Sequence, residues 1–343
     1  MADNVRVLAS KVVNGSVANV QFQGHVLGNL AAGSSASQLE LLIDKHFFGM
    51  DHPANLIPTT NDSAARYITY GYASGGLFGT DGAPSLTDIH QGALGDCYFL
   101  ASLGAVVAQS PSAIGNMFAD NGDGTFTVRF FAETNGKVGS ADYVTVDRWL
   151  PIDVSTVQSS GMQFADYDFL NEGLWVALAE KAYVQFSEEG LNQRQSSAYS
   201  SYVPNNYGSI EGGFGVLTMP SITGHNGEIY ANSSDYAAVG SYGGGLPNLA
   251  QIASGLANGL TLTAGTHGTS DAHIDELTGI VQRHEYVIVG ADLAKGTVTL
   301  YNPWRDNNSS IGSVSTGDVQ GFKVISYSTL VRYDLAEISV SYV

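Results

Sequence analysis

One cysteine occurs in the 343 residues, and it lies in the segment QGALGDCYFL, which runs from Gln91 to Leu100. A glycine-bearing turn precedes Cys97, and an apolar run of the length of a buried helix follows it. The amino end of a helix favours negative charge, because unpaired backbone N–H groups and the helix macrodipole meet there. The thiolate is the nucleophilic form of cysteine, so this position predicts a reactive thiol of lowered pKa. The competing interpretation is a small buried cysteine without chemistry.

A nucleophilic thiol needs a base beside it, and His284 in the segment RHEYVIVG is the candidate. Asn302 in TLYNPW lies 18 residues further on (302 − 284), and the pattern predicts two antiparallel strands joined by a turn at 291–296. Such a hairpin would bring both side chains together, so that the asparagine oxygen fixes the imidazole tautomer and Trp304 shields that hydrogen bond. Taken singly, His284 also fits a half-buried strand histidine and Asn302 an ordinary turn residue.

The elements that must position these side chains follow from hydrophobic periodicity. The apolar run at 98–108 ends before Pro111 and is predicted to be a core helix. Alternation of apolar and polar residues at 126–131 and 143–148 predicts strands. Residues 174–186 place their apolar side chains at helical spacing, which predicts a helix with one buried face.

The chain on either side of these elements is less regular. Residues 1–33 alternate short apolar pieces with glycine turns, which suits a small β element or a lead-in segment. Ser37 and Glu40 fit a capping box and predict a helix that runs to about Phe47. Around 192–215 the composition shifts to Ser, Tyr, Asn and Gly, which marks a boundary between two lobes. Beyond it the pattern predicts one helix and then four strands, at 246–256, 284–289, 297–302, 322–327 and 337–342.

Composition places the chain among soluble globular proteins rich in turns. It has 41 glycines, and its 14 basic and 32 acidic residues give a formal net charge of −18, which argues against nucleic-acid and anionic-membrane partners. One cysteine excludes an internal disulfide framework. No apolar run has the length of a signal peptide core or a spanning helix, so we expect a protein that is cytoplasmic or exported without a signal.

Five regions resemble, in order, the calpain-type cysteine proteases. QGALGDCYFLASLGA is similar to the active-site segment of that family, and YVTVDRWLP to its strand ending in Asp-Arg-Leu-Pro. LWVALAEKAY is similar to one of its helices, and RHEYVIVGADL with YNPW to its His and Asn segments. GFKVISYSTLVRYDLAEISV is similar to its terminal strand–helix–strand. The resemblance extends from about Ser85 to the C-terminus, and the Gly, Asn, Ser and Asp richness suggests a bacterial member.

The resemblance implies an α+β, papain-like fold whose two lobes enclose the active site between them. On this basis residues 85–195 form the first lobe, with the cysteine-bearing helix. Residues 196–343 form a β-rich second lobe with the histidine and asparagine. Residues 1–84 are a lead-in segment outside the resemblance.

The resemblance also implies the roles of four residues. Cys97 is the nucleophile, His284 the general base and then acid, and Asn302 the residue that orients the histidine. Gln91 donates to the oxyanion together with the Cys97 backbone N–H. The implied function is a thiol endopeptidase that cuts protein or peptide substrates through an acyl-enzyme, with no cofactor required for the chemistry. Two alternatives stay open: an inactive calpain-like binding module, and another papain-like acyl transfer such as deamidation or transglutamination.

The sequence departs from the family pattern around the predicted site. Tyr98 replaces the usual Trp after the cysteine. Arg283 and Glu285 flank His284 where the family often has Gly and Ala, and Arg305 replaces the Gly after Asn-Pro-Trp. These departures are expected to change substrate preference more than chemistry.

Calcium modulation is a further implication, because animal calpains bind calcium in each core lobe. Asp88 matches a ligand of the first lobe, whereas Gly173 stands where an acidic ligand is expected and Glu172 precedes it. The polar loop at 265–276 is interpreted as a mobile loop over the substrate cleft. It carries side chains whose spacing fits no tetrahedral zinc site, namely His267, Asp271, His273, Asp275 and Glu276.

Overall fold

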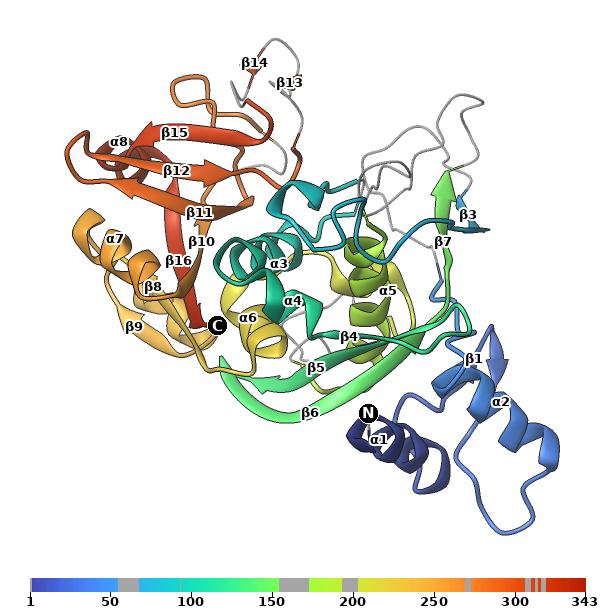
Figure 1. The fold of residues 1–343 in the computed structure, drawn as a ribbon. Coiled ribbons are helices and arrows are strands. Elements are labelled where there is room, and N and C mark those ends of the chain that lie inside the picture. The colour runs from blue at the N-terminus through green and yellow to red at the C-terminus, as the bar shows by residue number, and fades with distance from the viewer. Residues whose placement is uncertain are drawn as a thin grey trace.

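The computed structural model describes residues 2–54, 68–92, 94–153, 173–192, 203–268, 273–305, 310–311, 314–315 and 319–343 (Figure 1). Its α-helices are α1 (Ala2–Val13), α2 (Ala36–His46), α3 (Cys97–Gln109), α4 (Pro111–Gly115), α5 (Trp175–Glu188), α6 (Gly215–Thr223), α7 (Leu249–Ala257) and α8 (Tyr327–Tyr333). Its 3-10 helices are η1 (Leu86–Asp88), η3 (Tyr207–Ile210) and η4 (Ser234–Ala238).

The strands of the described residues belong mostly to antiparallel sheets, which together with the helices confirms the α+β fold class. They are β1 (Gln21–Phe22), β2 (His25–Val26), β3 (Ile68–Tyr72), β4 (Phe118–Asp120), β5 (Phe126–Thr134), β6 (Lys137–Val146), β7 (Trp149–Asp153), β8 (Gly227–Ala231), β9 (Tyr242–Gly244), β10 (Leu260–Thr266), β11 (Glu285–Asp292), β12 (Thr297–Tyr301), β13 (Ser310–Ile311), β14 (Val314–Ser315), β15 (Phe322–Ser326) and β16 (Leu335–Tyr342).

A seven-stranded sheet dominates the second half of the chain, in the order β15-β12-β11-β10-β16-β8-β9. Its neighbours are antiparallel, except for the parallel pair of β8 and β9. The predicted hairpin is confirmed as β11 and β12, which pair from Val287 opposite Tyr301 to Asp292 opposite Thr297. The predicted polar loop begins too early, because Gly265 and Thr266 still pair with β16.

Helix α3 packs against strands β10 and β11 of this sheet and against α6 (Figure 1). Every residue from Tyr98 to Val107 is buried, as the apolar run predicts. Gly104 permits the close approach, since a Cβ at that position would lie 2.8 Å from Cγ2 of Val287. The helix that begins at the cysteine is therefore fixed directly against the strand that follows the histidine.

Helix α5 forms the centre of the first half and differs from its prediction. The sequence predicts one apolar face, but every residue of α5 is buried, including Glu180 and Lys181. The ring of Tyr183 stacks on Phe99 of α3, with centroids 4.2 Å apart. The ammonium of Lys181 is satisfied by Asp147 Oδ1 at 2.5 Å and the Trp149 carbonyl at 2.9 Å. Polar residues can therefore be buried in this helix, because neighbouring groups in the core form hydrogen bonds and ion pairs with them.

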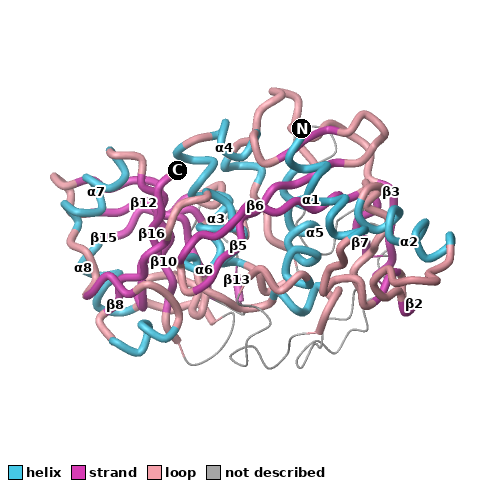
Figure 2. Tube along the Cα trace, turned by 90° about the horizontal axis from the view of Figure 1, so that it is seen from below, coloured by secondary structure: helices cyan, strands magenta, loops and turns pink. Residues whose placement is uncertain are grey.

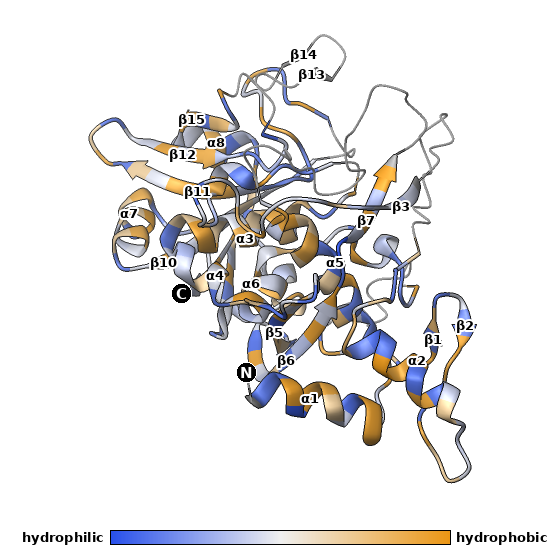
Figure 3. Ribbon diagram, turned by 45° about the vertical axis from the view of Figure 1, so that its right-hand side comes forward, coloured by the Kyte–Doolittle hydropathy of each residue, from blue (hydrophilic) through white to orange (hydrophobic). Residues whose placement is uncertain are grey.

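The N-terminal segment contains the small β element that the sequence predicts, at 21–26, and in addition a helix that it does not predict. Helix α1 covers residues 2–13, and the only β structure among described residues 2–54 with a named strand partner is the short pair β1–β2. Polar and apolar residues alternate around α1 (Figure 3), and the helix lies beside β6 (Figure 2). The next helix is also capped differently, because Ser35 rather than Ser37 accepts the hydrogen bond from the Gln38 backbone N–H.

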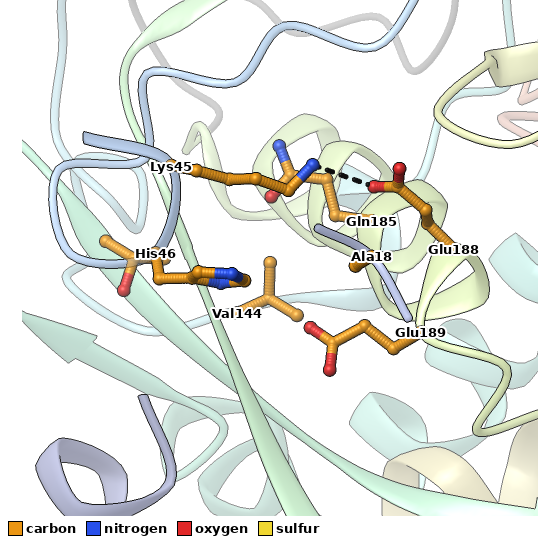
Figure 4. A pocket seen from close by; sticks show the side chains of 8 residues that line it. Ala18, Lys45, His46, Val144, Gln185, Glu188 and Glu189 are labelled. Atoms are coloured by element: carbon orange, nitrogen blue, oxygen red, sulfur yellow. Dashed lines mark hydrogen bonds and ion pairs between the residues drawn. The ribbon is translucent and has the colours of Figure 1, made fainter. Parts of the chain in front are cut away.

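Two buried lysines attach this N-terminal segment to the rest of the molecule. Lys11 of α1 contacts Asp142 at 2.9 Å and also pairs with Glu189. Lys45 of α2 contacts Glu188 at 3.1 Å beside a small cavity that Ala18, His46 and Gln185 also line (Figure 4). In the part of the chain that the structure describes, no helix is long and apolar enough to cross a membrane.

Candidate active site

Cys97 is the first residue of α3, as its sequence position predicts. Its neighbour Asp96 occupies the N-cap position without a side-chain cap, and the Asp96 carboxyl is wholly buried facing Glu180. The thiol faces the backbone N–H of Glu285, the first residue of β11. The sulfur therefore lies next to the residue that directly follows His284.

The acidity of the thiol contradicts the expectation drawn from the helix start. Burial raises the pKa of Cys97 to about 12, and the carboxyls of Glu285 and Asp96 add to the rise. Burial also lowers the pKa of His284 to about 4, although its hydrogen bond to Asn302 acts in the opposite direction. In this conformation both the thiol and the imidazole are neutral at neutral pH. Cys97 as a whole is half-buried, but the protein atoms around its sulfur and two nearby acids outweigh the stabilising effect of the helix terminus.

The hairpin of β11 and β12 brings His284 and Asn302 together, as the sequence predicts. Nε2 of His284 lies 2.8 Å from Oδ1 of Asn302, and both side chains are buried. An amide oxygen only accepts, so Nε2 carries the proton and Nδ1 of the neutral ring is the basic nitrogen. The Trp304 ring packs on His284 with centroids 5.1 Å apart, and its backbone N–H donates to the same Asn302 oxygen at 3.1 Å. The imidazole is thus oriented and shielded from water.

Gln91 lies in the turn before Cys97 and is buried. Its Nε2 donates to the Leu94 carbonyl at 2.6 Å, so the amide closes its own turn here. Its backbone N–H donates to the carbonyl of Pro303 at 2.8 Å. This last bond ties the turn before the cysteine to the residue after Asn302, and thereby links the two halves of the predicted site.

The departures from the family pattern have local physical reasons. Tyr98 donates its hydroxyl to the Ile210 carbonyl at 2.8 Å, and its ring fills the space that a Cβ on Gly213 would occupy, 2.6 Å away. Arg283 and Arg305 have φ values of 49° and 57°, in the left-handed region that favours glycine. Both arginines therefore occupy strained backbone positions on either side of the histidine–asparagine pair.

Asp88, the predicted calcium ligand, has structural contacts of its own, and calcium binding there stays a prediction. Oδ2 of Asp88 accepts from the Trp175 indole N–H at 2.7 Å and from the Ser85 backbone N–H at 2.8 Å, so it holds α5 and η1 together. A Cβ on Gly173 would lie 2.2 Å from the Leu77 carbonyl oxygen, which leaves no room for an acidic side chain there. Glu172 lies outside the described residues. Within the described ranges, no three His, Cys, Asp or Glu side chains gather as metal ligands.

The polar loop before His284 is only partly described. Residues 269–272, which include Asp271, lie outside the described part of the chain, and the interpretation of a mobile loop stays a prediction. His267 donates its backbone N–H to Asp334, and Asp275 caps a turn by accepting from Leu277 and Thr278. His267 thus ties the start of the loop to the residue before β16, and Asp275 stabilises a turn within the loop.

The sequence interpretation does not anticipate that Glu180 and Glu337 are buried. Glu180 directly follows the apolar run from Trp175 to Ala179 in α5, and Glu337 lies in the final strand before the buried Ile338. A carboxylate inside an apolar run is a sequence feature that could have revealed both, because such residues are seldom fully buried without a partner.

Comparison with known proteins places these observations in one family. Residues 74–320 match the family described as "Calpain family cysteine protease". The chain is 31% identical over 236 residues to the calpain-type cysteine protease DEK1 of Arabidopsis thaliana. The aligned region covers 67% of this chain and 9% of that protein. It is 30% identical over 229 residues to DEK1 of Zea mays, over 66% of the chain and 9% of the relative. Calpain-13 of Rattus norvegicus is 26% identical over 230 residues, over 63% of the chain and 29% of the relative.

Proposed function

Because the chain belongs to the calpain family of cysteine proteases, we propose that it hydrolyses peptide bonds with Cys97, His284 and Asn302 as its catalytic residues. The observation that carries the proposal is the 2.8 Å contact between His284 Nε2 and Asn302 Oδ1, in a hairpin whose first strand presents a backbone N–H to the Cys97 sulfur. Since the chain spans 9% of the length of its plant relatives, the substrates of those larger proteins are not transferred to it.

The proposed reaction begins with proton transfer from the Cys97 thiol to Nδ1 of His284. The sulfur then attacks the peptide carbonyl carbon, and the carbonyl oxygen becomes an oxyanion. The Cys97 backbone N–H donates to that oxygen, and Gln91 does so after its amide leaves the Leu94 carbonyl. His284 returns the proton to the leaving amine, which leaves an acyl group on the sulfur. Water then loses a proton to His284, attacks the thioester and releases the acid.

The neutral thiol and imidazole fit a resting state in this mechanism. Peptide binding would displace water from the site and place a polarised carbonyl beside the sulfur, where thiolate formation and attack occur together. Asn302 keeps Nδ1 free by holding Nε2, and no metal ion or cofactor enters these steps. We propose that the catalytic chemistry needs none, and that any calcium effect acts on conformation.

Casein cleavage tests the proposal. The variants Cys97→Ala and His284→Ala are expected to lose cleavage entirely, and Cys97→Ala should also keep the thermal unfolding temperature of the unchanged protein. His25→Ala is the matched control, because His25 is exposed on β2, and it is expected to cut as the unchanged protein does. Cleavage by the Cys97→Ala variant would refute the assignment. Release of ammonia from glutamine peptides without cleavage would instead indicate an amide acyl transfer, and added calcium or chelator reports metal dependence.

A further inference from the structure

Two hydrogen bonds of opposite direction join the segment before the predicted nucleophile to the turn that carries Asn302. The Tyr301 hydroxyl donates to the Ile89 carbonyl at 2.8 Å. Two residues further along each segment (91 − 89 and 303 − 301), the Gln91 backbone N–H donates to the Pro303 carbonyl, also at 2.8 Å. Asn302 is the residue between these two bonds. The predicted catalytic asparagine is therefore tied to the other part of the site on both sides.

The side chain of Tyr301 points into the hydrophobic core that contains α3. Tyr301 is the last residue of β12 and is 0% exposed. Its strand neighbour Leu300 faces the opposite side of the sheet and packs in a separate core with Ile288 and Val298. The ring of Tyr301 lies edge-on to the ring of Phe322, with centroids 5.1 Å apart. Because packing fixes the ring, the hydroxyl has a defined position.

The acceptor of this hydroxyl is fixed as well. Ile89 is 0% exposed and directly follows η1, whose Asp88 accepts from the Trp175 indole N–H of α5 at 2.7 Å. A buried carbonyl without a donor is unfavourable, so the Tyr301 hydroxyl stabilises this position of the segment. The segment 89–91 is therefore held between α5 on one side and β12 on the other.

Asn302 is held in the same arrangement. Its backbone N–H donates to the Gly321 carbonyl at 2.8 Å, and its side-chain oxygen lies 2.8 Å from Nε2 of His284. Gly321 has a φ of 80°, and a Cβ there would lie 2.8 Å from Cε2 of Tyr301, so the glycine leaves room for the tyrosine ring. A shift of Tyr301 is passed to Asn302, which follows it directly, and through Asn302 to the imidazole.

We propose that Tyr301 is a positioning residue that fixes the separation between the turn of Gln91 and the hairpin of His284 and Asn302. Its hydroxyl keeps the oxyanion donor and the imidazole in one frame, so that both meet the same peptide bond. Tyr301 acts through the residues beside it and takes no part in bond making. This inference rests on the proposed function, in which Gln91 and His284 act together. A purely structural tyrosine would stabilise the fold and leave the geometry of the site unchanged when its hydroxyl is removed.

Hydrogen exchange of backbone amides in the full chain tests the proposal without requiring proteolysis. Tyr301→Phe keeps the packed ring and removes the donor. The Gln91 amide is expected to exchange about tenfold faster in this variant, because its bond to Pro303 then opens locally. The amides of the paired strands β5 and β6 are expected to change much less. Equal acceleration at Gln91 and across β5 and β6 would indicate a merely structural role and overturn the proposal.

Gly321→Ala is a second variant, which displaces the Tyr301 ring from the other side and retains the hydroxyl. It is expected to give the same selective acceleration at Gln91. Tyr242→Phe is the matched control, because Tyr242 of β9 donates its hydroxyl to the Ala231 carbonyl at 2.8 Å at the edge of the sheet away from β12. Unchanged exchange at Gln91 in both Tyr301→Phe and Gly321→Ala, or an equal acceleration in Tyr242→Phe, would overturn the proposal.

Peptide cleavage shows whether this separation matters for catalysis. Tyr301→Phe is expected to lower kcat about tenfold and to leave KM within about twofold, because the hydroxyl orients reacting groups and does not bind the peptide. Unchanged kcat in a variant with faster exchange at Gln91 would refute the positioning role. If the unchanged protein cuts no peptide, the proposed function is refuted, and exchange at Gln91 still decides whether Tyr301 fixes the separation.

Discussion

Replacing Lys45 by methionine should weaken the contact between the N-terminal segment and the protease core and so lower the free energy of unfolding. Nζ of Lys45 lies 2.5 Å from Asp51 Oδ2, 3.1 Å from Glu188 Oε2 and 2.9 Å from the Gln21 carbonyl. The lysine side chain is 4% exposed, and Asp51 and Glu188 are 0% and 2% exposed. Methionine fills a similar length without charge, so the variant leaves two acids in a dry site without their cation.

The size of the effect follows from that burial. Burial acts to lower the pKa of Lys45, but the charges of Asp51 and Glu188 outweigh it, so the lysine is held in its charged form. Removing one partner of a buried ion pair costs about 3–5 kcal/mol. Two features moderate the loss. Asp51 keeps the Asn205 amide at 3.0 Å, and burial already raises the pKa of Glu188 to about 7, so that this acid can take a proton. The loss should therefore be larger at about pH 8 than at about pH 6.

Denaturant unfolding of the full chain measures this free energy. Arg6→Met is the control, because Arg6 pairs with Asp3 on the surface, with side chains 79% and 75% exposed, and the variant should unfold as the unchanged protein does. Equal stabilities of Lys45→Met and the unchanged protein at about pH 8 would refute the reasoning. The same result would show that Lys45 does not anchor the N-terminal segment to the rest of the molecule.

The remaining predictions concern pH and backbone strain. Burial raises the pKa values of Asp96, Glu188, Glu189 and Glu285 to about 7, above their ordinary values of 3.8 for Asp and 4.5 for Glu. Burial lowers the pKa values of His46 to about 2 and of His284 to about 4, which acts in the opposite direction, but these two groups are fewer than the four acids. The folded state therefore binds more protons than the unfolded state in this window, so the unfolding temperature should fall as pH rises from about 4.5 to about 7. A flat or rising profile across that window would contradict it. Arg305→Gly should raise the free energy of unfolding by about 1 kcal/mol, because glycine tolerates a φ of 57° that strains an arginine. Destabilisation in that variant would show that the arginine side chain contributes more than its backbone costs.

Local patterns predict the parts of the site that local structure determines. The apolar run after Cys97 predicts both ends of α3 closely. The alternation around His284 predicts the hairpin that joins His284 to Asn302. Both depend on periodicity and short connections, which a sequence displays directly. The same reasoning fails for α1, because residues 2–13 do not show that Lys11 forms ion pairs with Asp142 and Glu189 in the folded chain.

Long-range packing also explains the wrong expectation for the thiol. A helix start lowers a cysteine pKa only where solvent or a cation can support the negative charge. Here Asp96 directly precedes the cysteine, and Glu285 is the first residue of β11, 188 residues further along the chain (285 − 97). Both carboxyls are buried, and both act on the thiol. Sequence spacing shows the first acid but not its burial, and it shows nothing of the second.

The formal charge of −18 also takes a different meaning in the folded chain. The residue count treats every charge alike, yet Asp96, Glu285 and Glu337 lie in the interior, and Lys11 and Lys45 are buried with carboxylates. Acids with a pKa raised to about 7 are partly protonated at neutral pH, so the folded protein carries less negative charge than the residue count gives. Part of the acidic excess therefore lies inside the molecule, where Asp142, Glu188 and Glu189 hold the N-terminal segment through Lys11 and Lys45.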